Sequence, residues 1–160
     1  MSGHSKWSQI RRQKGITDVK RGQEFSKLGK LISIAAKKGA DPAANAALAG
    51  MIERARAANM PKENIERAIK RASEKGSELF EITVKALTKS GIGLTIEGIT
   101  DNKNRAIGEI KNILGEHNAK MVEWIPDYPM PMDEETKILI EKLEENDDVK
   151  EVRVPTNSRN

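Results

Sequence analysis

The hydrophobic pattern of this 160-residue chain changes its period at Gly76, and that change limits the folds open to it. Before Gly76, apolar side chains recur every three or four residues, which is typical of amphipathic helices. After Gly76, short runs rich in Ile, Val, Leu and Thr alternate with polar residues, which is typical of strands. The sequence therefore predicts an α+β protein whose helical part precedes its mixed part.

The part before Gly76 predicts three helices, over residues 18–39, 41–59 and 61–76. Asp41 and Pro42 suit a helix start, because aspartate accepts free backbone N–H bonds and proline fits the first helical turn. The expected buried positions are Phe25, Leu28, Ile32, Ala35, Leu48, Met51, Ile52, Ala55, Ile65, Ala68, Ile69 and Ala72. We therefore expect residues 1–76 to form a basic three-helix bundle with an N-terminal arm over residues 1–17.

The part after Gly76 predicts a sheet with two helices. Expected strands cover residues 79–87, 92–99, 121–125 and 149–154, and the first two form a hairpin around Ser90-Gly91. One expected helix is capped by Asp101 or Asn102 and ends near residues 117–118, and the other is capped by Asp133. The order ββαβαβ predicts a second domain over residues 77–160, a two-layer α/β sandwich with both helices on one face of its sheet.

Charge is distributed very unevenly along the chain, whose overall net charge is +4. Residues 1–75 contain 17 Lys and Arg against 7 Asp and Glu, whereas residues 76–160 contain 11 against 17. The first 38 residues alone hold 10 basic side chains and only two acidic ones, with Trp7 among them. Such a stretch suits nucleic acid, because cations displace counterions from phosphates and an aromatic ring stacks on bases. The alternative is a solvated, partly disordered basic arm.

Composition excludes several classes of function. Without cysteine the chain has no disulfides, no zinc fingers and no thiol catalysis, and two histidines are too few for a His-rich metal site. There is no Gly-rich phosphate loop, so we expect no cofactor, no metal, no small-molecule substrate and no enzymatic activity. The apolar run 31–36 is too short to span a membrane, and no secretory signal follows the basic start. We expect a cytoplasmic monomer, although an Arg-rich mitochondrial transit peptide is the alternative for the N-terminus.

Four motifs in this order are similar to those of the YebC/PmpR family. They are Gly3-His4-Ser5-Lys6-Trp7 with Ile10, Lys14 and Asp18; the stretch Ala55 to Lys70; Thr100-Asp101-Asn102-Lys103-Asn104-Arg105; and Ile125-Pro126 with Asp133-Glu134-Glu135 and Asp147-Asp148-Val149. Two departures accompany the resemblance. The family usually carries a further α/β domain between the helix ending near residue 117 and Ile125-Pro126, so this chain resembles a short member that lacks it. The family's Tyr-Gly-Pro-Gly-Gly type turn is replaced by residues 88–93.

The resemblance implies a regulator of gene expression of one of two kinds. Some family members are described as DNA-binding transcriptional regulators, and this is the function we expect. Others act on the ribosome, where they bind ribosomal or transfer RNA and assist synthesis of difficult stretches such as consecutive prolines; mitochondrial relatives activate translation of cytochrome oxidase. The basic half of the chain fits either activity.

Two sets of side chains are candidates for binding nucleic acid. The first set comprises His4, Lys6, Trp7, Arg11, Arg12, Lys14, Lys20, Arg21, Lys27 and Lys30. Closely spaced cations can follow a phosphate backbone without reading sequence, while Trp7 either stacks on a base or only anchors the arm. The second set comprises Arg54, Arg56, Lys62, Arg67, Lys70 and Arg71. Its alternative role is ion pairing with Glu53, Glu63 and Glu66 at helical spacing.

Two further stretches have simpler interpretations. Residues 101–105 read as a helix N-terminus with its cap, although an exposed helix start can also bind an anion. The acidic run 141–148 reads as a solvated helix end rather than a metal site.

Overall fold

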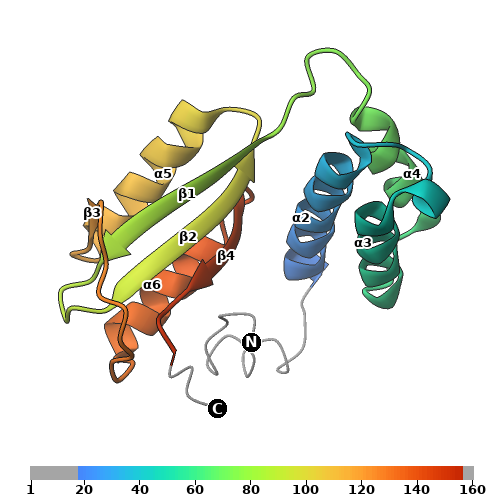
Figure 1. Ribbon diagram of the computed structural model, residues 1–160. Coiled ribbons are helices and arrows are strands. Elements are labelled where there is room, and N and C mark those ends of the chain that lie inside the picture. Colours follow the sequence, from blue (N-terminus) through green and yellow to red (C-terminus); the bar gives the residue numbers. More distant parts are fainter. Residues whose placement is uncertain (1–17, 157–160) are drawn as a thin grey trace. The chain divides into compact units, whose positions relative to one another are not determined.

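The computed structural model describes residues 18–156, which form two compact units, 18–80 and 81–156. The predicted boundary after residue 76 lies in the segment that joins the last helix of the first unit to the first strand of the second. The first unit is helical and the second is mixed, so the fold is α+β (Figure 1). Within the described residues, no helix has the length and apolar character needed to cross a bilayer.

The helical unit is built around α2 (Asp18–Ala36), which packs against α3 (Ala46–Ala57) and α4 (Lys62–Arg71) (Figure 1). Its core repeats at the helical period predicted from the sequence. The buried members are Leu28, Ile32, Ala36, Leu48, Ile52, Ala55, Met60, Ile65 and Ala68, and Phe25, Ala35, Met51, Ile69 and Ala72 pack against them. These aliphatic side chains and alanines pack against one another, so this stripe holds the bundle together.

One predicted helix start was wrong. Asp41 accepts a hydrogen bond from Ala43 N, but it caps only the 3₁₀ turn η1 (Pro42–Ala44). The α-helix begins at Ala46 and is capped by Asn45, whose Oδ1 accepts from Leu48 N at 3.1 Å. The Asn45 amide also donates to the carbonyl oxygens of Ala35 and Gly39, each at 2.8 Å. Asn45 therefore starts α3 and, at the same time, binds carbonyl oxygens in and just after the last turn of α2.

The loop between α3 and α4 is a tight reversal. Asn59 has a φ of 64°, a left-handed conformation that asparagine tolerates better than most residues, and Met60 N bonds back to Ala55 O at 2.9 Å. Met60 itself is buried in the core. Pro61 then precedes α4, which ends at Arg71 rather than at Gly76 as predicted. The α4 helix is fastened to α2 by the buried Ser33 hydroxyl, which donates to Ala68 O at 2.7 Å.

The second unit has the predicted order ββαβαβ. Strands β1 (Phe80–Leu87), β2 (Gly93–Thr100), β3 (Lys120–Val122) and β4 (Val149–Arg153) form one sheet in the order β3-β1-β2-β4. Helices α5 (Lys103–Glu116) and α6 (Glu134–Glu144) both lie against one face of this sheet, as the sequence predicted (Figure 1). Alternate residues of β1, Ile82, Val84 and Ala86, face them in the core.

The third strand is shorter than predicted. It pairs antiparallel with β1 only from Lys120 to Val122, and the expected strand residues up to Ile125 lie in the following loop. Pro126 lacks a backbone N–H and could not have continued the ladder, but pairing with β1 already ends at Val122, before the proline. The edge strand β4 pairs with β2, with an irregularity between Glu97 and Gly98. Gly98 is required there, because a β-carbon would lie 2.5 Å from Asp148 O.

Three charged side chains meet on β2 and β4. Glu97 and Glu151 are register partners, and Arg153 forms ion pairs with both, at 2.6 Å from Nη2 to Glu97 Oε1 and 3.6 Å from Nε to Glu151 Oε1. Burial, followed by a hydrogen bond with Glu151, raises the pKa of Glu97, and the Arg153 charge partly opposes this. The arginine thus makes a pairing of like charges across the two strands tolerable.

Candidate nucleic-acid interface

Most of the first set of candidate residues falls outside the described part of the chain. His4, Lys6, Trp7, Arg11, Arg12 and Lys14 lie within residues 1–17, so their role stays a prediction from the sequence. The remaining four belong to α2, where Lys20 and Arg21 are exposed and Lys27 and Lys30 are half-buried. Lys20 and Lys27 are two turns apart and share a helix face. The α2 helix thus carries cations on its surface and apolar residues in the core.

The second set lies on α3 and α4. Arg54, Arg56, Lys62, Arg67 and Lys70 are exposed, and Arg71 is half-buried with its Nε lacking a hydrogen-bond partner among the described residues. Lys62 is paired with Glu66 at 3.8 Å, an exposed contact of little energetic weight. Within residues 18–156, the side chains of Arg54, Arg56, Arg67 and Lys70 make no ion pair.

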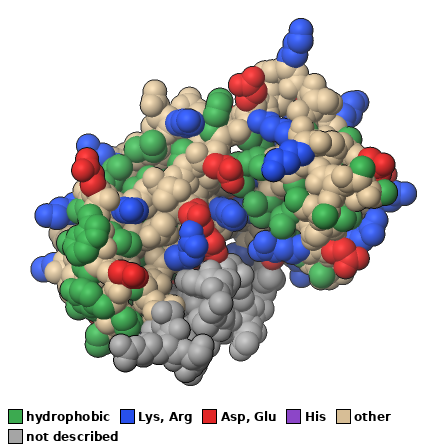
Figure 2. Space-filling view, viewed as in Figure 1, with side chains coloured by type: hydrophobic (Ala, Val, Ile, Leu, Met, Phe, Trp, Pro, Cys, Tyr) green, Lys and Arg blue, Asp and Glu red, His purple; other side chains and the backbone are tan. Residues whose placement is uncertain are grey.

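That result weighs against the alternative role for the second set. Glu53, Glu63 and Glu66 have helical spacing to the basic residues, yet Lys62–Glu66 is the one such pair among the described residues of α3 and α4. Arg54 and Arg56 lie in the last turn of α3, and Lys70 and Arg71 in the last turn of α4, where positive charge complements the helix dipole. Their positive charge is therefore compatible with the helices and remains available to a polyanion. Lys and Arg side chains are visible across this unit in Figure 2.

Side chains of the motif at residues 100–105 are engaged in contacts within the protein. Asn102 caps α5, with Oδ1 accepting from Arg105 N at 3.0 Å. The Arg105 guanidinium donates to Asp148 Oδ2 at 2.9 Å and to Asp101 Oδ1 at 2.7 Å, and these bonds, first the one to Asp148, raise the pKa of Arg105 further above its usual range. Asp148 is buried and belongs to another of the family-like motifs. The two motifs thus join the start of α5 to the loop before β4, which is a structural role.

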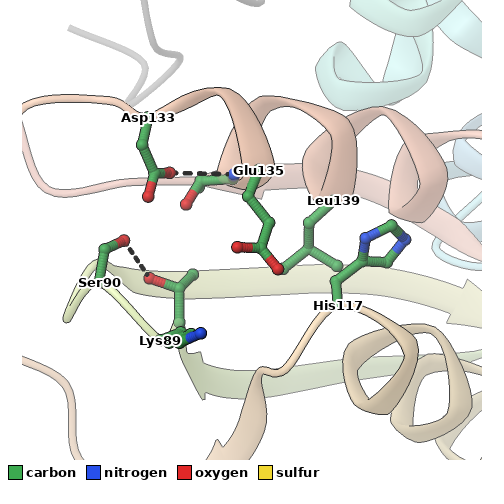
Figure 3. A pocket seen from close by; sticks show the side chains of 8 residues that line it. Lys89, Ser90, His117, Asp133, Glu135 and Leu139 are labelled. Atoms are coloured by element: carbon green, nitrogen blue, oxygen red, sulfur yellow. Dashed lines mark hydrogen bonds between the residues drawn. The ribbon is translucent and has the colours of Figure 1, made fainter.

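A small pocket lies where the β1–β2 turn meets the end of α5 and the start of α6 (Figure 3). Its lining residues are Thr88, Lys89, Ser90, His117, Asp133, Glu135, Thr136 and Leu139. Asp133 caps α6 through Thr136 N at 3.0 Å, and hydrogen bonds to Thr136 and then to Ser90 lower the pKa of this carboxyl. Thr88 and Ser90 hydroxyls are 3.1 Å apart. Asp133, Thr136, Thr88 and Ser90 are therefore engaged with one another, and these contacts hold the turn against α6.

The acidic side chains of the second unit are dispersed. Between residues 18 and 156, no group of three or more His, Asp or Glu side chains is placed to hold a metal ion. The acidic run 141–148 is split between roles: Glu144 and Asp148 are buried, and Asn146 bonds to Glu109 Oε2 at 2.8 Å and to Asp148 N at 2.9 Å. It is therefore more than the solvated helix end that the sequence predicted.

The structure places this chain in a class of two-unit α+β proteins, in which a basic three-helix unit is followed by a unit of order ββαβαβ. Residues 5–75 match the sequence profile of the TACO1/YebC protein N-terminal domain. The chain is 47% identical over 126 residues to the "Probable transcriptional regulatory protein YrbC" of Bacillus subtilis, covering 77% of this chain and 52% of that protein. A "Probable transcriptional regulatory protein" of Dictyoglomus turgidum is 43% identical over 150 residues, covering 89% and 58%. The chain belongs to the YebC family.

The similarity extends to the fold but not to the full length of the relatives. A crystal structure of a conserved hypothetical protein, Aq1575, from Aquifex aeolicus matches with a TM-score of 0.83 and 24% identity, covering 96% of this chain and 97% of that one. The chain spans between 50% and 58% of the length of relatives such as those from Rubrobacter xylanophilus and Dictyoglomus turgidum. The absence of the family's middle domain stays a prediction from the sequence.

Proposed function

We propose that this protein is a non-enzymatic, nucleic-acid-binding regulator of gene expression, of the DNA-binding transcriptional regulator type. The observation that carries the proposal is the set of exposed cations without ion pairs on α3 and α4, Arg54, Arg56, Arg67 and Lys70. The relatives carry the name "Probable transcriptional regulatory protein", and this name supports the same function. We further propose that it acts in the cytoplasm and as a monomer.

The mode of binding that follows is contact with the phosphate backbone. Exposed Lys and Arg release counterions when they approach phosphates, and this supplies affinity whatever the base sequence. The N-terminal arm adds further cations close in sequence to α2, among them Arg11, Arg12 and Lys14. The α+β unit is acidic, so we assign the contact to the first 80 residues.

The direct test is fluorescence anisotropy of a labelled DNA duplex titrated with the protein over a range of salt concentrations. In the variant Arg54→Glu/Arg67→Glu/Lys70→Glu we expect affinity at low salt to fall on the order of a hundredfold and the salt slope to decrease by about one for each lost phosphate contact. The matched control, Lys85→Glu/Lys111→Glu/Lys120→Glu, changes the net charge equally at exposed positions of the α+β unit. Equal losses in both variants would contradict the assignment to the bundle.

The physiological target is tested in cells by crosslinking, followed by sequencing of bound DNA and RNA, with ribosome sedimentation alongside. Peaks at a few promoters, and absence from ribosomal fractions, are the expected result. Crosslinks concentrated on ribosomal or transfer RNA, with co-sedimentation, would replace the transcriptional role with a translational one.

A further inference from the structure

The segment from Met121 to Glu135 combines apolar and acidic residues in an unusual way. It contains Trp124, Tyr128, four methionines or isoleucines and three prolines, together with five carboxylates and no Lys, Arg or His. It includes one of the two tryptophans and the single tyrosine of a chain that is only 3% aromatic. Alternation of acidic and large apolar residues is a composition found in protein-interaction segments.

The structure holds this segment in place and leaves its aromatic side chains outside. Ile125 packs so closely over Gly93 that a β-carbon at position 93 would lie 2.8 Å from Ile125 Cβ. Met130 lies over Gly91 at an ordinary contact distance, since a β-carbon there would be 3.7 Å from its Cε. Trp124 and Tyr128 remain 72% and 57% exposed. The segment is thus anchored by some of its apolar residues and presents others to solvent.

The exposed apolar side chains of this segment form a surface and are not scattered singly over the protein. Met121, Trp124, Tyr128 and Met130 are four of the six large apolar residues exposed among the described residues. Hydrophobic side chains gather over β3 and the segment that follows it in Figure 2. Exposed patches that contain Trp, Tyr and Met are typical of surfaces that bind other proteins.

Charge decides which kind of partner fits. Glu123, Asp127, Glu134 and Glu135 are exposed on the same segment and would repel phosphates, which argues against nucleic acid. Two copies of this surface placed against each other would bring their carboxylates together, which argues against a symmetric dimer. A protein surface with an apolar groove and a rim of Lys and Arg satisfies both the aromatic anchors and the carboxylates.

We propose that residues 121–135 form a docking segment for a partner protein, in which Trp124 and Tyr128 enter an apolar groove while Glu123 and Asp127 contact basic side chains at its rim. The inference goes beyond the proposed function and does not depend on it, because it uses a different unit and a different chemistry. Aromatic anchors of this kind supply most of the binding energy of an interface.

The experiment is photo-crosslinking in cells with p-benzoylphenylalanine in place of Tyr128, and in place of the exposed Lys111 on α5 as the matched control position. We expect position 128 to crosslink a defined protein, with the crosslinked peptides carrying Lys or Arg beside apolar residues, and position 111 to give none of that product. Trp124→Ser should reduce the yield roughly thirtyfold, as expected for loss of an interface anchor. Glu123→Lys/Asp127→Lys should reduce it about tenfold, through lost charge complementarity.

Several outcomes would overturn the proposal. They are crosslinks from position 128 to nucleic acid, crosslinks to a second copy of this chain, equal yields at positions 128 and 111, and a yield that the charge reversal leaves unchanged. Since Trp124, Glu123 and Asp127 are exposed, a thermal melt of each variant should match the parent protein and rule out unfolding as the cause. Repeating the crosslink in the Arg54→Glu/Arg67→Glu/Lys70→Glu variant keeps this test separate from nucleic-acid binding, and the yield should not change.

Discussion

At the residue scale, a single β-carbon can decide whether two segments of the chain pack closely. Two buried glycines differ in whether they leave space for one. Gly29 lies in the middle of α2, where a β-carbon would meet Ala68 Cβ and Met60 Cε at 3.9 Å each, an ordinary contact. Gly98 lies in β2, where a β-carbon would stand 2.5 Å from the Asp148 carbonyl oxygen, which is backbone and cannot move away cheaply. The first glycine is replaceable and the second is required.

We therefore predict opposite effects of the same substitution at the two positions. Gly29→Ala should raise the free energy of unfolding of the helical unit by about 0.5–1 kcal/mol, because alanine loses less backbone entropy in a helix. Gly98→Ala should lower the stability of the α+β unit by about 1–3 kcal/mol, because the strand or the Asp148 loop must shift. Urea unfolding followed by circular dichroism checks both predictions. A destabilising effect of Gly29→Ala would show that α2 and α4 pack more tightly than the 3.9 Å distances indicate.

Asp133 combines a cap with a titratable group, so its contribution to stability depends on pH. Hydrogen bonds to Thr136 and Ser90 hold its folded-state pKa below the unperturbed value of 3.8. The stabilisation is then fully present above that value and is lost as the pH falls through the folded-state pKa.

Replacing Asp133 should show this dependence directly. Asp133→Ala should lower the stability of the α+β unit by about 1 kcal/mol at pH 7, the usual loss for a helix cap. The difference from the parent protein should shrink as the pH is lowered below 3.8. Asp133→Asn is the control, since asparagine caps as well as aspartate but does not titrate there. Thermal melts from pH 7 to pH 2 measure the effect, and a difference independent of pH would refute it.

At the scale of the elements, one residue in the connection between α2 and α3 stabilises both the end of the first helix and the start of the second. Asn45 caps α3 and bonds to carbonyl oxygens of Ala35 and Gly39, whereas Asp41 caps only a short 3₁₀ turn. Both residues have side chains typical of helix starts, and the sequence pattern favoured the aspartate because a proline follows it. The choice between them depends on which backbone groups the end of α2 leaves free.

We expect Asn45→Ala to destabilise the helical unit by about 2–3 kcal/mol, because one cap and two further hydrogen bonds are lost. Asp41→Ala, which removes an exposed cap of a three-residue turn, should change stability by less than about 1 kcal/mol. Thermal melts followed at 222 nm compare the two. Similar losses would mean that η1 matters more to the start of α3 than its contacts indicate.

Element types were largely predictable, and element ends were less so. The stripes of Leu28 and Ile32 in α2 and of Leu48 and Ile52 in α3 are buried as predicted, because the spacing of apolar residues along the chain sets the helical period. The predicted end of β3 was three residues too late. The extent of β3 depends on how far it pairs with β1, and that pairing joins residues far apart in the sequence.

At the scale of the whole chain, the separation of charge between its two parts is the main argument for a polyanion partner. The first 75 residues carry a net charge of +10 and the remainder carries −6. This asymmetry needs no tertiary structure to be seen, but the sequence leaves open whether the cations are neutralised by nearby acids. Arg67 and Lys70 lie close in sequence to Glu63 and Glu66, and their freedom from ion pairs within the described residues was decided by side-chain placement.

The N-terminal arm supplies a prediction at this scale. Arg11→Glu/Arg12→Glu/Lys14→Glu should nearly abolish binding of a DNA duplex at moderate salt, because three cations close in sequence to α2 become anions. The thermal melt should not change, since stability resides in the cores of the two units. Anisotropy titrations measure the affinity, with Lys85→Glu/Lys111→Glu/Lys120→Glu as the control of equal charge. Unchanged affinity would refute the role of the arm.

The sequence by itself determined the features that neighbouring residues encode: the helical and strand periods, the cap at Asp133, the order ββαβαβ and the basic character of the first part. Only the tertiary structure decided which distant groups meet. It joined Arg105 to Asp148 across 43 residues, set the strand order β3-β1-β2-β4 and left Trp124 and Tyr128 outside while burying Ile125 partway. The physical reason is that periods and caps arise within a few residues, whereas burial and ion pairing depend on the packing of the whole unit.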